Sequence, residues 1–179
     1  MSTKRVVTRT KRTRRAQFEG FKFTQEMVPT DGGDILADYR ARAWEAFEDL
    51  PYPTTRDEPW RRTDIRALKD DFLLPIKGAY EDLPAIPKSL LKPLVSDQHG
   101  GQIVLLPGGL QKEPLDSELT QKGVIFTDLE TAAQQYPEQL AKTLGQIVEP
   151  KEGKFAALTS ALTRNGIFVY VPRGVQVEQ

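Results

Sequence analysis

The 179-residue chain contains no cysteine and only one histidine, His99. Without cysteine, these residues can form no disulfide bond, carry out no thiolate catalysis and hold no cysteine-ligated metal or cluster. His99 has no cysteine near it, so a zinc site of the His/Cys type is excluded as well. We therefore expect no cofactor in this segment of polypeptide.

Long apolar runs are also missing. No run approaches the length of a transmembrane helix, and the N-terminus lacks the apolar stretch of a secretory signal. We therefore expect no membrane association and a cytoplasmic protein. The one alternative is that residues 1–15 form a short organelle transit peptide, because they are rich in Arg and Thr and contain no acid.

The charge is unevenly distributed. Residues 1–15 hold seven Lys or Arg. Subtracting these from the total of 25 leaves 18 bases against 25 acids in residues 16–179, a net charge of −7. The neutral total thus combines a basic arm with an acidic body. Residues 1–20 have too little apolar content to offset the entropy of ordering, so we expect a disordered arm.

Residues 34–50 carry a helical pattern, with Asp34 expected as the cap and Pro51 as the end. One face is apolar and the other is expected to be solvated. The apolar set is Leu36, Tyr39, Ala43, Trp44, Phe47 and Leu50, and the solvated set is Asp38, Arg40, Arg42, Glu45 and Asp49. Before this helix, a short segment is expected to dock through Phe18, Phe21, Phe23, Met27 and Val28.

The segment 51–68 is predicted to be a joint between two parts of the fold. Pro51 and Pro53 break the chain, Trp60 is the first large apolar group after the break, and Thr63 or Asp64 can begin a new helical turn. Glu58 is close enough in sequence to pair with Arg61 or Arg62. From these residues alone, Trp60 is best interpreted as a core anchor with surface charges around it.

The second half of the chain alternates strand and helix. Buried strands are predicted at 103–106 and 124–126, and residues 107–109 suggest a hairpin-type turn better than a phosphate loop. Thr127 to Glu130 spells a capping box for a helix that Pro137 should kink or divide, with Gly145 as its C-cap. A last helix is predicted over 155–162. This order predicts a small α+β or α/β domain, interrupted by a proline-rich loop over 75–93.

The last residues alternate, with Ile167, Val169 and Val171 on one side and Phe168 and Tyr170 on the other. Both sides are apolar, which is typical of a strand covered on both faces. Pro172 to Gly174 should turn the chain, and Val175 and Val177 resemble the start of another strand. We expect these strands to need partners outside this chain; the alternative is that they pair with the strands near 103 and 124.

The joint and the ending together resemble the SufB/SufD family, whose members are subunits of the SUF iron–sulfur cluster assembly complex. The form of the joint favours the SufD branch, because SufB relatives carry a different version that contains Met. The matching residues in the joint are Leu50, Pro51, Pro53, Glu58, Trp60, Arg61, Thr63, Asp64 and Ile65. Those of the ending run from Phe155 to Val175 and include Asn165, Gly166, Phe168, Tyr170, Pro172 and Gly174.

The resemblance implies a division into three parts: the disordered arm 1–20, an N-terminal α/β domain of SufD type over 21–165, and the first strand of a right-handed parallel β-helix over 166–179. It also implies a non-catalytic scaffold that meets SufB-like and SufC-like proteins through a longer chain. The residues linked to cluster assembly in the family lie beyond these motifs, so the matching residues are interpreted as structural.

Two other functions are open at this stage. The basic arm of residues 1–15 could give salt-dependent binding to nucleic acid, although the body is acidic and the arm has no aromatic residues for base stacking. The second alternative is that the chain is an enzyme. Glu113, Asp116 and Glu118 cluster, but no His or Cys lies beside them, so a catalytic site is not expected.

Overall fold

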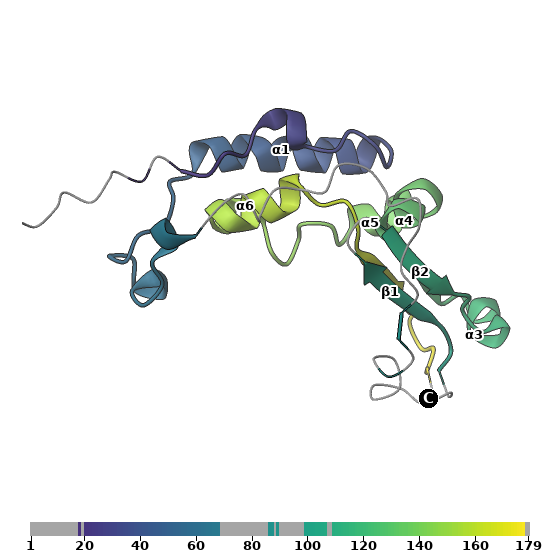
Figure 1. The fold of residues 1–179 in the computed structure, drawn as a ribbon. Helices are drawn as coiled ribbons and strands as arrows, with labels where there is room; N and C mark the ends of the chain where they lie inside the picture. Colours follow the sequence, from purple (N-terminus) through teal and green to yellow (C-terminus); the bar gives the residue numbers. More distant parts are fainter. Residues whose placement is uncertain are drawn as a thin grey trace, which may run out of the picture.

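A computed structural model describes Phe18, residues 20–68, the single positions 86, 87 and 89, and residues 99–106 and 109–177. The predictions for most of the arm 1–20, for residues 69–74 after the joint and for most of the loop 75–93 lie outside these residues. Figure 1 shows the longest helix, α1, lying along α6, with a β-hairpin at the far end of the molecule.

The predicted long helix is confirmed as α1, Asp34–Asp49, and it ends at Leu50, just before Pro51. The prediction that Asp34 caps it was wrong. The cap position is Gly33, which has φ of +83°, and Asp34 is the first helical residue. Glycine reaches this left-handed conformation without the steric penalty of a Cβ, so the chain turns sharply into the helix there.

Arg40 does not lie on a solvated face as predicted, since its side chain is only 1% exposed. Its Nε donates to the Thr163 carbonyl at 2.8 Å, and its Nη1 donates to the Pro29 carbonyl at 3.3 Å and to the Asp31 carbonyl. Position 40 is four residues after Leu36 and three before Ala43, and both of these side chains are fully buried. Helical periodicity therefore places Arg40 on the buried stripe, where its donors satisfy three backbone carbonyls.

Two apolar clusters form the core, and α1 contributes to both. The first joins α1 to α6, Lys154–Ala161, and the second joins the start of α1 to the later helices and the last strand. The first consists of Ala43, Trp44, Ala46, Phe47, Ala157, Leu158 and Ala161. The second consists of Leu36, Leu129, Ala132, Ala133, Leu140 and Phe168.

The segment before α1 docks as predicted. It contains one short 3₁₀ turn, η1, Gln25–Met27. Phe18 and Phe21 meet the Tyr52 ring edge-on, with centroids 5.3 and 5.5 Å away, and Phe23 meets Phe47 at 6.5 Å. Edge-to-face packing of this kind is favourable beyond simple burial, so the aromatic rings fix this segment against the end of α1.

The region around residue 103 forms a hairpin rather than a buried strand. β1, Gln102–Leu106, pairs antiparallel with β2, Gly109–Glu113, and only residues 107 and 108 lie between them. The predicted hairpin connection is thus confirmed, but β2 was not predicted and β1 is only half-buried. The segment 109–113 lacks the alternation of apolar and polar residues that is typical of a strand. It forms a strand because it pairs with β1.

The next elements follow the predicted order with shifted boundaries. β3, Ile125–Asp128, leads into α4, Leu129–Gln135, and α5, Pro137–Ala141, so Pro137 does separate two abutting helices. The predicted capping box was wrong by one residue, because Asp128 rather than Thr127 is the cap and accepts from the Thr131 N–H at 2.8 Å. Gly145 is also not the C-cap; Lys142 holds that position.

The last strand finds a partner within the chain. α6 is followed by β4, Ile167–Tyr170, which pairs antiparallel with β3. The expectation that this strand lacks a partner here was therefore wrong, as was the expectation that both of its faces are covered. Phe168 is buried, but Ile167, Val169 and Tyr170 are exposed. Residues 172–175 turn as predicted, whereas Val175 and Val177 pair with no strand among the described residues.

The fold class is α+β. The described strands form two separate two-stranded antiparallel sheets rather than one α/β layer. The remaining elements are the short helix α3, Ser117–Gln121, and the 3₁₀ turns η2, Glu58–Trp60, η3, Ile65–Ala67, and η5, Pro150–Glu152. Over the described part of the chain, no helix has the length and apolar character needed to cross a membrane.

Candidate functional site

The joint after α1 is held by hydrogen bonds within the loop 52–57. The backbone N–H and the hydroxyl of Thr54 both donate to Asp57 Oδ2, at 2.7 and 3.1 Å. The Arg56 N–H donates to Thr54 Oγ1 at 3.2 Å. Short polar side chains that bond the nearby backbone in this way favour turns over helices. The loop therefore has a defined conformation although most of its residues are exposed.

Trp60 fixes the joint to the rest of the fold, but it is half-buried rather than enclosed in a core. Its ring lies over Phe155 at the start of α6, with centroids 5.3 Å apart and planes tilted by 33°. The predicted pair forms between Glu58 and Arg61, with 3.5 Å between Oε1 and Nη1. Because both side chains are exposed, this pair contributes little to stability.

Asp64 begins a new helical turn as predicted, the 3₁₀ turn η3. Its carboxylate accepts from the Arg66 backbone N–H at 3.1 Å and from the Arg66 guanidinium at 2.7 Å through each of Nε and Nη2. The hydrogen bonds to Asp64 raise the pKa of Arg66. This two-point contact orients both side chains beside the loop 52–57.

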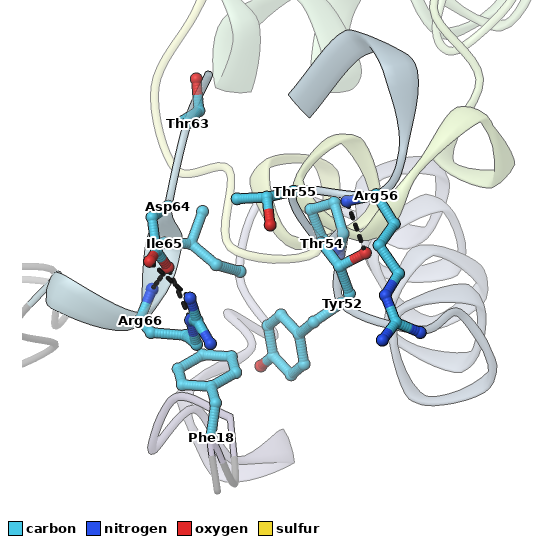
Figure 2. Close-up of a pocket in the computed structure, with 10 residues that line it drawn as sticks. Phe18, Tyr52, Thr54, Thr55, Arg56, Thr63, Asp64, Ile65 and Arg66 are labelled. Carbon is cyan, nitrogen blue, oxygen red and sulfur yellow. Dashed lines mark hydrogen bonds and ion pairs between the residues drawn. The ribbon is translucent and has the colours of Figure 1, made fainter. Parts of the chain in front are cut away.

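A cavity of about 540 Å³ lies between this turn and the loop. In Figure 2, Phe18 and Tyr52 form one wall, and Thr55, Asp64 and Ile65 face them across the hollow. The lining is Phe18, Tyr52, Pro53, Thr54, Thr55, Arg56, Thr63, Asp64, Ile65 and Arg66. These side chains offer aromatic surface and hydroxyl groups but no histidine or cysteine. The hollow can therefore bind a group, but its described lining contains no nucleophile paired with a base.

The second group of motif residues lies beyond the other end of α6. Asn165 Nδ2 donates to the Gly109 carbonyl at 3.4 Å, which connects the end of α6 to β2. Gly166 accepts from the Leu129 N–H at 3.0 Å, and a Cβ placed on Gly166 would lie only 3.3 Å from the Leu129 side chain. The absence of a side chain at 166 therefore permits close contact between β4 and α4.

The later motif residues complete this region. Phe168 is buried in the second apolar cluster, and Pro172 packs near Gly123. Gly174 has φ of +83°, and the Val175 N–H donates to the Pro172 carbonyl at 3.1 Å. A positive φ favours glycine, so the turn needs this residue type. The structure thus holds the two motif groups apart, one at each end of α6.

β4 presents an apolar surface. Ile167 and Val169 are 45% and 58% exposed, and Val171 continues the same side of the strand. Within the described residues β4 pairs only with β3, so its other edge has unpaired backbone groups. An exposed edge beside an apolar row is a natural place for further polypeptide to pack.

Two basic residues fix the fold in ways that were not predicted. Lys154 donates from Nζ to the Phe47 carbonyl near the end of α1, and its Nζ lies 4.1 Å from the Phe47 ring centroid and 4.7 Å from that of Tyr52. Burial lowers the pKa of Lys154. Arg40 is the other. The spacing of Arg40 from Leu36 and Ala43 already places it on the apolar stripe of α1. No sequence pattern indicates that Lys154 is buried.

The predicted acidic cluster has structural partners. Asp116 caps α3 by accepting from the Glu118 N–H at 3.0 Å, and Glu118 pairs with Lys122 at 2.9 Å. Glu113 Oε2 lies 3.6 Å from His99 Nε2. Among the described residues, no group of three or more His, Cys, Asp or Glu side chains is arranged to hold a metal ion.

The family described as the SufBD protein N-terminal region matches residues 13–179, which include both motif groups. The chain belongs to the SufBD family. The SufBD match confirms the resemblance seen in the joint and in the ending. The individual roles of the motif residues remain predictions, although the contacts of Trp60, Asp64, Gly166 and Phe168 described above are all structural.

Curated SufBD relatives include SufD of Bacillus subtilis, which is named an iron–sulfur cluster assembly protein. It is 34% identical over 148 residues, covering 80% of this chain and 33% of SufD. An iron–sulfur cluster assembly SufBD family protein of Staphylococcus aureus strain USA300 is 31% identical over 158 residues, covering 87% of this chain and 30% of its own length. The chain thus spans about a third of the length of these relatives.

Proposed function

We propose that this chain serves iron–sulfur cluster assembly as the N-terminal, non-catalytic scaffold region of a SufD-type subunit. The observation that carries the proposal is the SufBD match over residues 13–179, together with the 34% identity to SufD of Bacillus subtilis. The described contacts support a structural role, because the motif side chains stabilise turns and close packing rather than meeting at one reactive centre.

The proposal assigns β4 the task of joining this region to the rest of a longer polypeptide. The apolar row of Ile167, Val169 and Val171 and the free edge of β4 would continue into a right-handed parallel β-helix. An apolar strand face is stabilised when another layer of polypeptide covers it. In this arrangement the N-terminal region covers one end of the β-helix.

The proposed partners are SufB-like and SufC-like proteins in the cytoplasm, met through the longer chain. The N-terminal region itself would bind no cofactor and carry out no chemical step. Its contribution would be to keep the subunit folded and to fix the end of the β-helix.

A chimeric protein tests this proposal. The N-terminal third of Bacillus subtilis SufD is replaced by the 179-residue chain, and the chimera is co-expressed with tagged SufB and SufC proteins of that organism. We expect the chimera to co-purify with both, and a SufD from which the N-terminal third is deleted to give a lower yield of complex. A chimera with Ile167→Glu and Val169→Glu should behave like the deletion, whereas Leu68→Glu, at an exposed apolar position at the end of the joint, should not.

Two results would contradict the proposal. One is a folded chimera, shown by circular dichroism, that fails to associate with either protein while native SufD does. The other is an iron–sulfur chromophore bound by the 179-residue chain alone after incubation with ferrous iron and sulfide, which would exclude a role limited to scaffolding.

A further inference from the structure

The solvent-exposed side of α1 is strongly acidic. Its single basic side chain is Arg42, whose Nε donates to the backbone carbonyl of Asp38 at 3.3 Å. We call the five acids of this side, with the intervening surface of the helix, the acidic face of α1. These acids are Asp34, Asp38, Glu45, Glu48 and Asp49, and all are exposed.

Only Asp34, in the first turn of α1, favours the helix dipole; the rest of the acidic face is not explained by the stability of the helix. Asp34 and Asp38 are four residues apart, as are Glu45 and Asp49, and like charges at this spacing destabilise a helix. Glu48 and Asp49 also lie in the last turn, where negative charge opposes the helix dipole. Within the described part of the chain, none of the five carboxylates lies within ion-pair distance of a base, although the charge of Glu48 opposes the lowering of the Lys154 pKa by burial.

An exposed apolar pair stands beside the acidic face. Ile147 is 88% exposed and Val148 is 59% exposed. They belong to the turn 144–151, which packs against α1: Gly145, with φ of +69°, lies so close to the Tyr39 ring that an added Cβ would be 2.7 Å from it. This turn is therefore held against the helix and keeps the two apolar side chains in place.

A groove lies between the acidic face and the turn that carries the apolar pair. A hollow of about 450 Å³ separates α1 from the turn, and both sides contribute charged side chains. From α1 these are Arg42, Glu45 and Asp49, and from the turn they are Glu149 and Lys151. Three of these five side chains are acids and two are bases, so the groove carries a small net negative charge.

We propose that the acidic face of α1, together with Ile147 and Val148, is a docking surface for a basic amphipathic segment of a partner protein. Lys or Arg side chains of the segment would pair with the carboxylates, and its apolar side chains would cover the exposed pair. Charge complementarity selects this occupant, because nucleic acid and anionic lipid would both be repelled by five carboxylates. This inference stands apart from the proposed scaffold function.

The test uses the complete 179-residue chain and a synthetic helical peptide of Lys and Leu that is basic on one side and apolar on the other. Binding is measured by calorimetry in 150 mM salt, where weak long-range attraction is largely screened. In the face variant, Asp38→Asn, Glu45→Gln and Asp49→Asn are combined. The matched control combines Glu58→Gln, Glu118→Gln and Glu138→Gln, which changes the net charge equally on three other elements.

We expect the face variant to bind the peptide about tenfold more weakly, while the control binds as the parent chain does. Replacing both apolar residues, Ile147→Thr with Val148→Thr, should also weaken binding severalfold. The face variant should at the same time be more resistant to urea, because the like-charge repulsion on α1 is relieved. A loss of binding in a variant that is more stable cannot arise from unfolding.

Three outcomes would overturn the proposal. Equal weakening in the face variant and the control would show attraction to net charge alone. Unchanged binding in the face variant would place the peptide elsewhere. Binding that appears only after residues 1–15 are deleted would show that the chain's own basic arm takes this surface, and not a partner protein.

Discussion

Arg40 joins three parts of the chain that are far apart in sequence. From the middle of α1 its guanidinium reaches the carbonyls of Pro29 and Asp31 before the helix and the carbonyl of Thr163 after α6. Burial lowers the pKa of Arg40, while the Asp31 carboxylate, whose Oδ1 lies 3.4 Å from Nη1, acts in the opposite direction. A charged group enclosed in this way stabilises the fold only while all its hydrogen bonds are made.

Arg40→Met should therefore lower the free energy of unfolding by about 3 kcal/mol, because the side chain keeps its bulk while the three carbonyls lose their donors. Arg40→Lys should cost less, since an ammonium retains the charge but cannot reproduce the planar fork. Urea denaturation measures the free energy of unfolding of both variants. Arg42→Met is the matched control on the exposed side of the same helix, and a loss in Arg42→Met equal to that in Arg40→Met would contradict this account.

At the residue scale, the sequence predicted apolar burial better than polar burial. Helical periodicity placed Leu36, Ala43 and Phe47 correctly on the buried side of the helix. The same periodicity also places Arg40 there, but its charge led to the wrong prediction that Arg40 is exposed. A charged side chain is buried only when specific acceptors surround it, and here they come from residues 29–31 and 163. These acceptors meet through tertiary packing, so no local pattern predicts them.

The element α4 depends on one carboxylate for its start. Burial disfavours the charged form of Asp128, but the hydrogen bonds from the Thr131 N–H and hydroxyl, at 2.8 and 2.7 Å, outweigh it, together with the charge of Lys112. The net effect lowers the pKa of Asp128 below its usual 3.8. The predicted capping box lies at the start of α4, as the structure shows, but the cap residue is Asp128 rather than Thr127. The carboxylate of Asp128 is a stronger hydrogen-bond acceptor than the Thr127 hydroxyl.

Asp128→Ala should cost about 1–2 kcal/mol at neutral pH through loss of this cap. Because the pKa is lower in the folded state than in the unfolded state, the stabilisation by the carboxylate is present above 3.8 and is lost as the pH falls through the folded-state pKa. Thermal unfolding from pH 7 to pH 2.5 should therefore show the gap between parent and variant narrowing only at the acidic end. A gap of constant size would show that the carboxylate charge is not involved.

The joint is a second element whose order depends on few contacts. Its loop hydrogen bonds are exposed, so its attachment to α6 depends on two rings: Trp60 and Tyr52 lie 5.3 and 6.4 Å from the Phe155 ring centroid. The sequence predicted the position of this attachment, because Trp60 is the first large apolar residue after the prolines. The sequence did not show that Phe155 would be its neighbour, since that contact spans almost a hundred residues.

Trp60→Ala should release the joint without unfolding the domain. We expect amide hydrogen exchange of residues 57–66 to become at least about tenfold faster, which corresponds to about 1.4 kcal/mol of lost local stability. Exchange in α1 and α6 should change much less. Arg62→Ala, an exposed change in the same turn, serves as the control, and equal acceleration in both variants would show that Trp60 does not attach the joint.

At the scale of the whole molecule, α1 spans two apolar clusters and so connects the α6 side to the β3–β4 side. The order of most helices and strands was predictable because it depends on local periodicity and on Pro and Gly. The pairing of β3 with β4 was given only as the alternative, since it brings together residues about forty positions apart. The pairing of β3 with β4 also determines that the side of β4 carrying Phe168 is buried and that the side carrying Ile167 and Val169 is exposed.

The same pairing leaves Ile167, Val169 and Val171 on the outside of the 179-residue chain. Apolar rows beside a free strand edge promote association, so the chain should form dimers or larger species as its concentration rises. Val169→Lys should keep it monomeric, because a charge at the centre of the row resists burial in an interface. Leu68→Lys removes a similarly exposed apolar group, 52% against 58% for Val169, from the end of the joint and should leave association unchanged. Sedimentation velocity from 5 to 200 μM distinguishes these cases. If the parent chain stays monomeric throughout, the apolar row of β4 is not adhesive, and the proposed junction at β4 loses its main physical support.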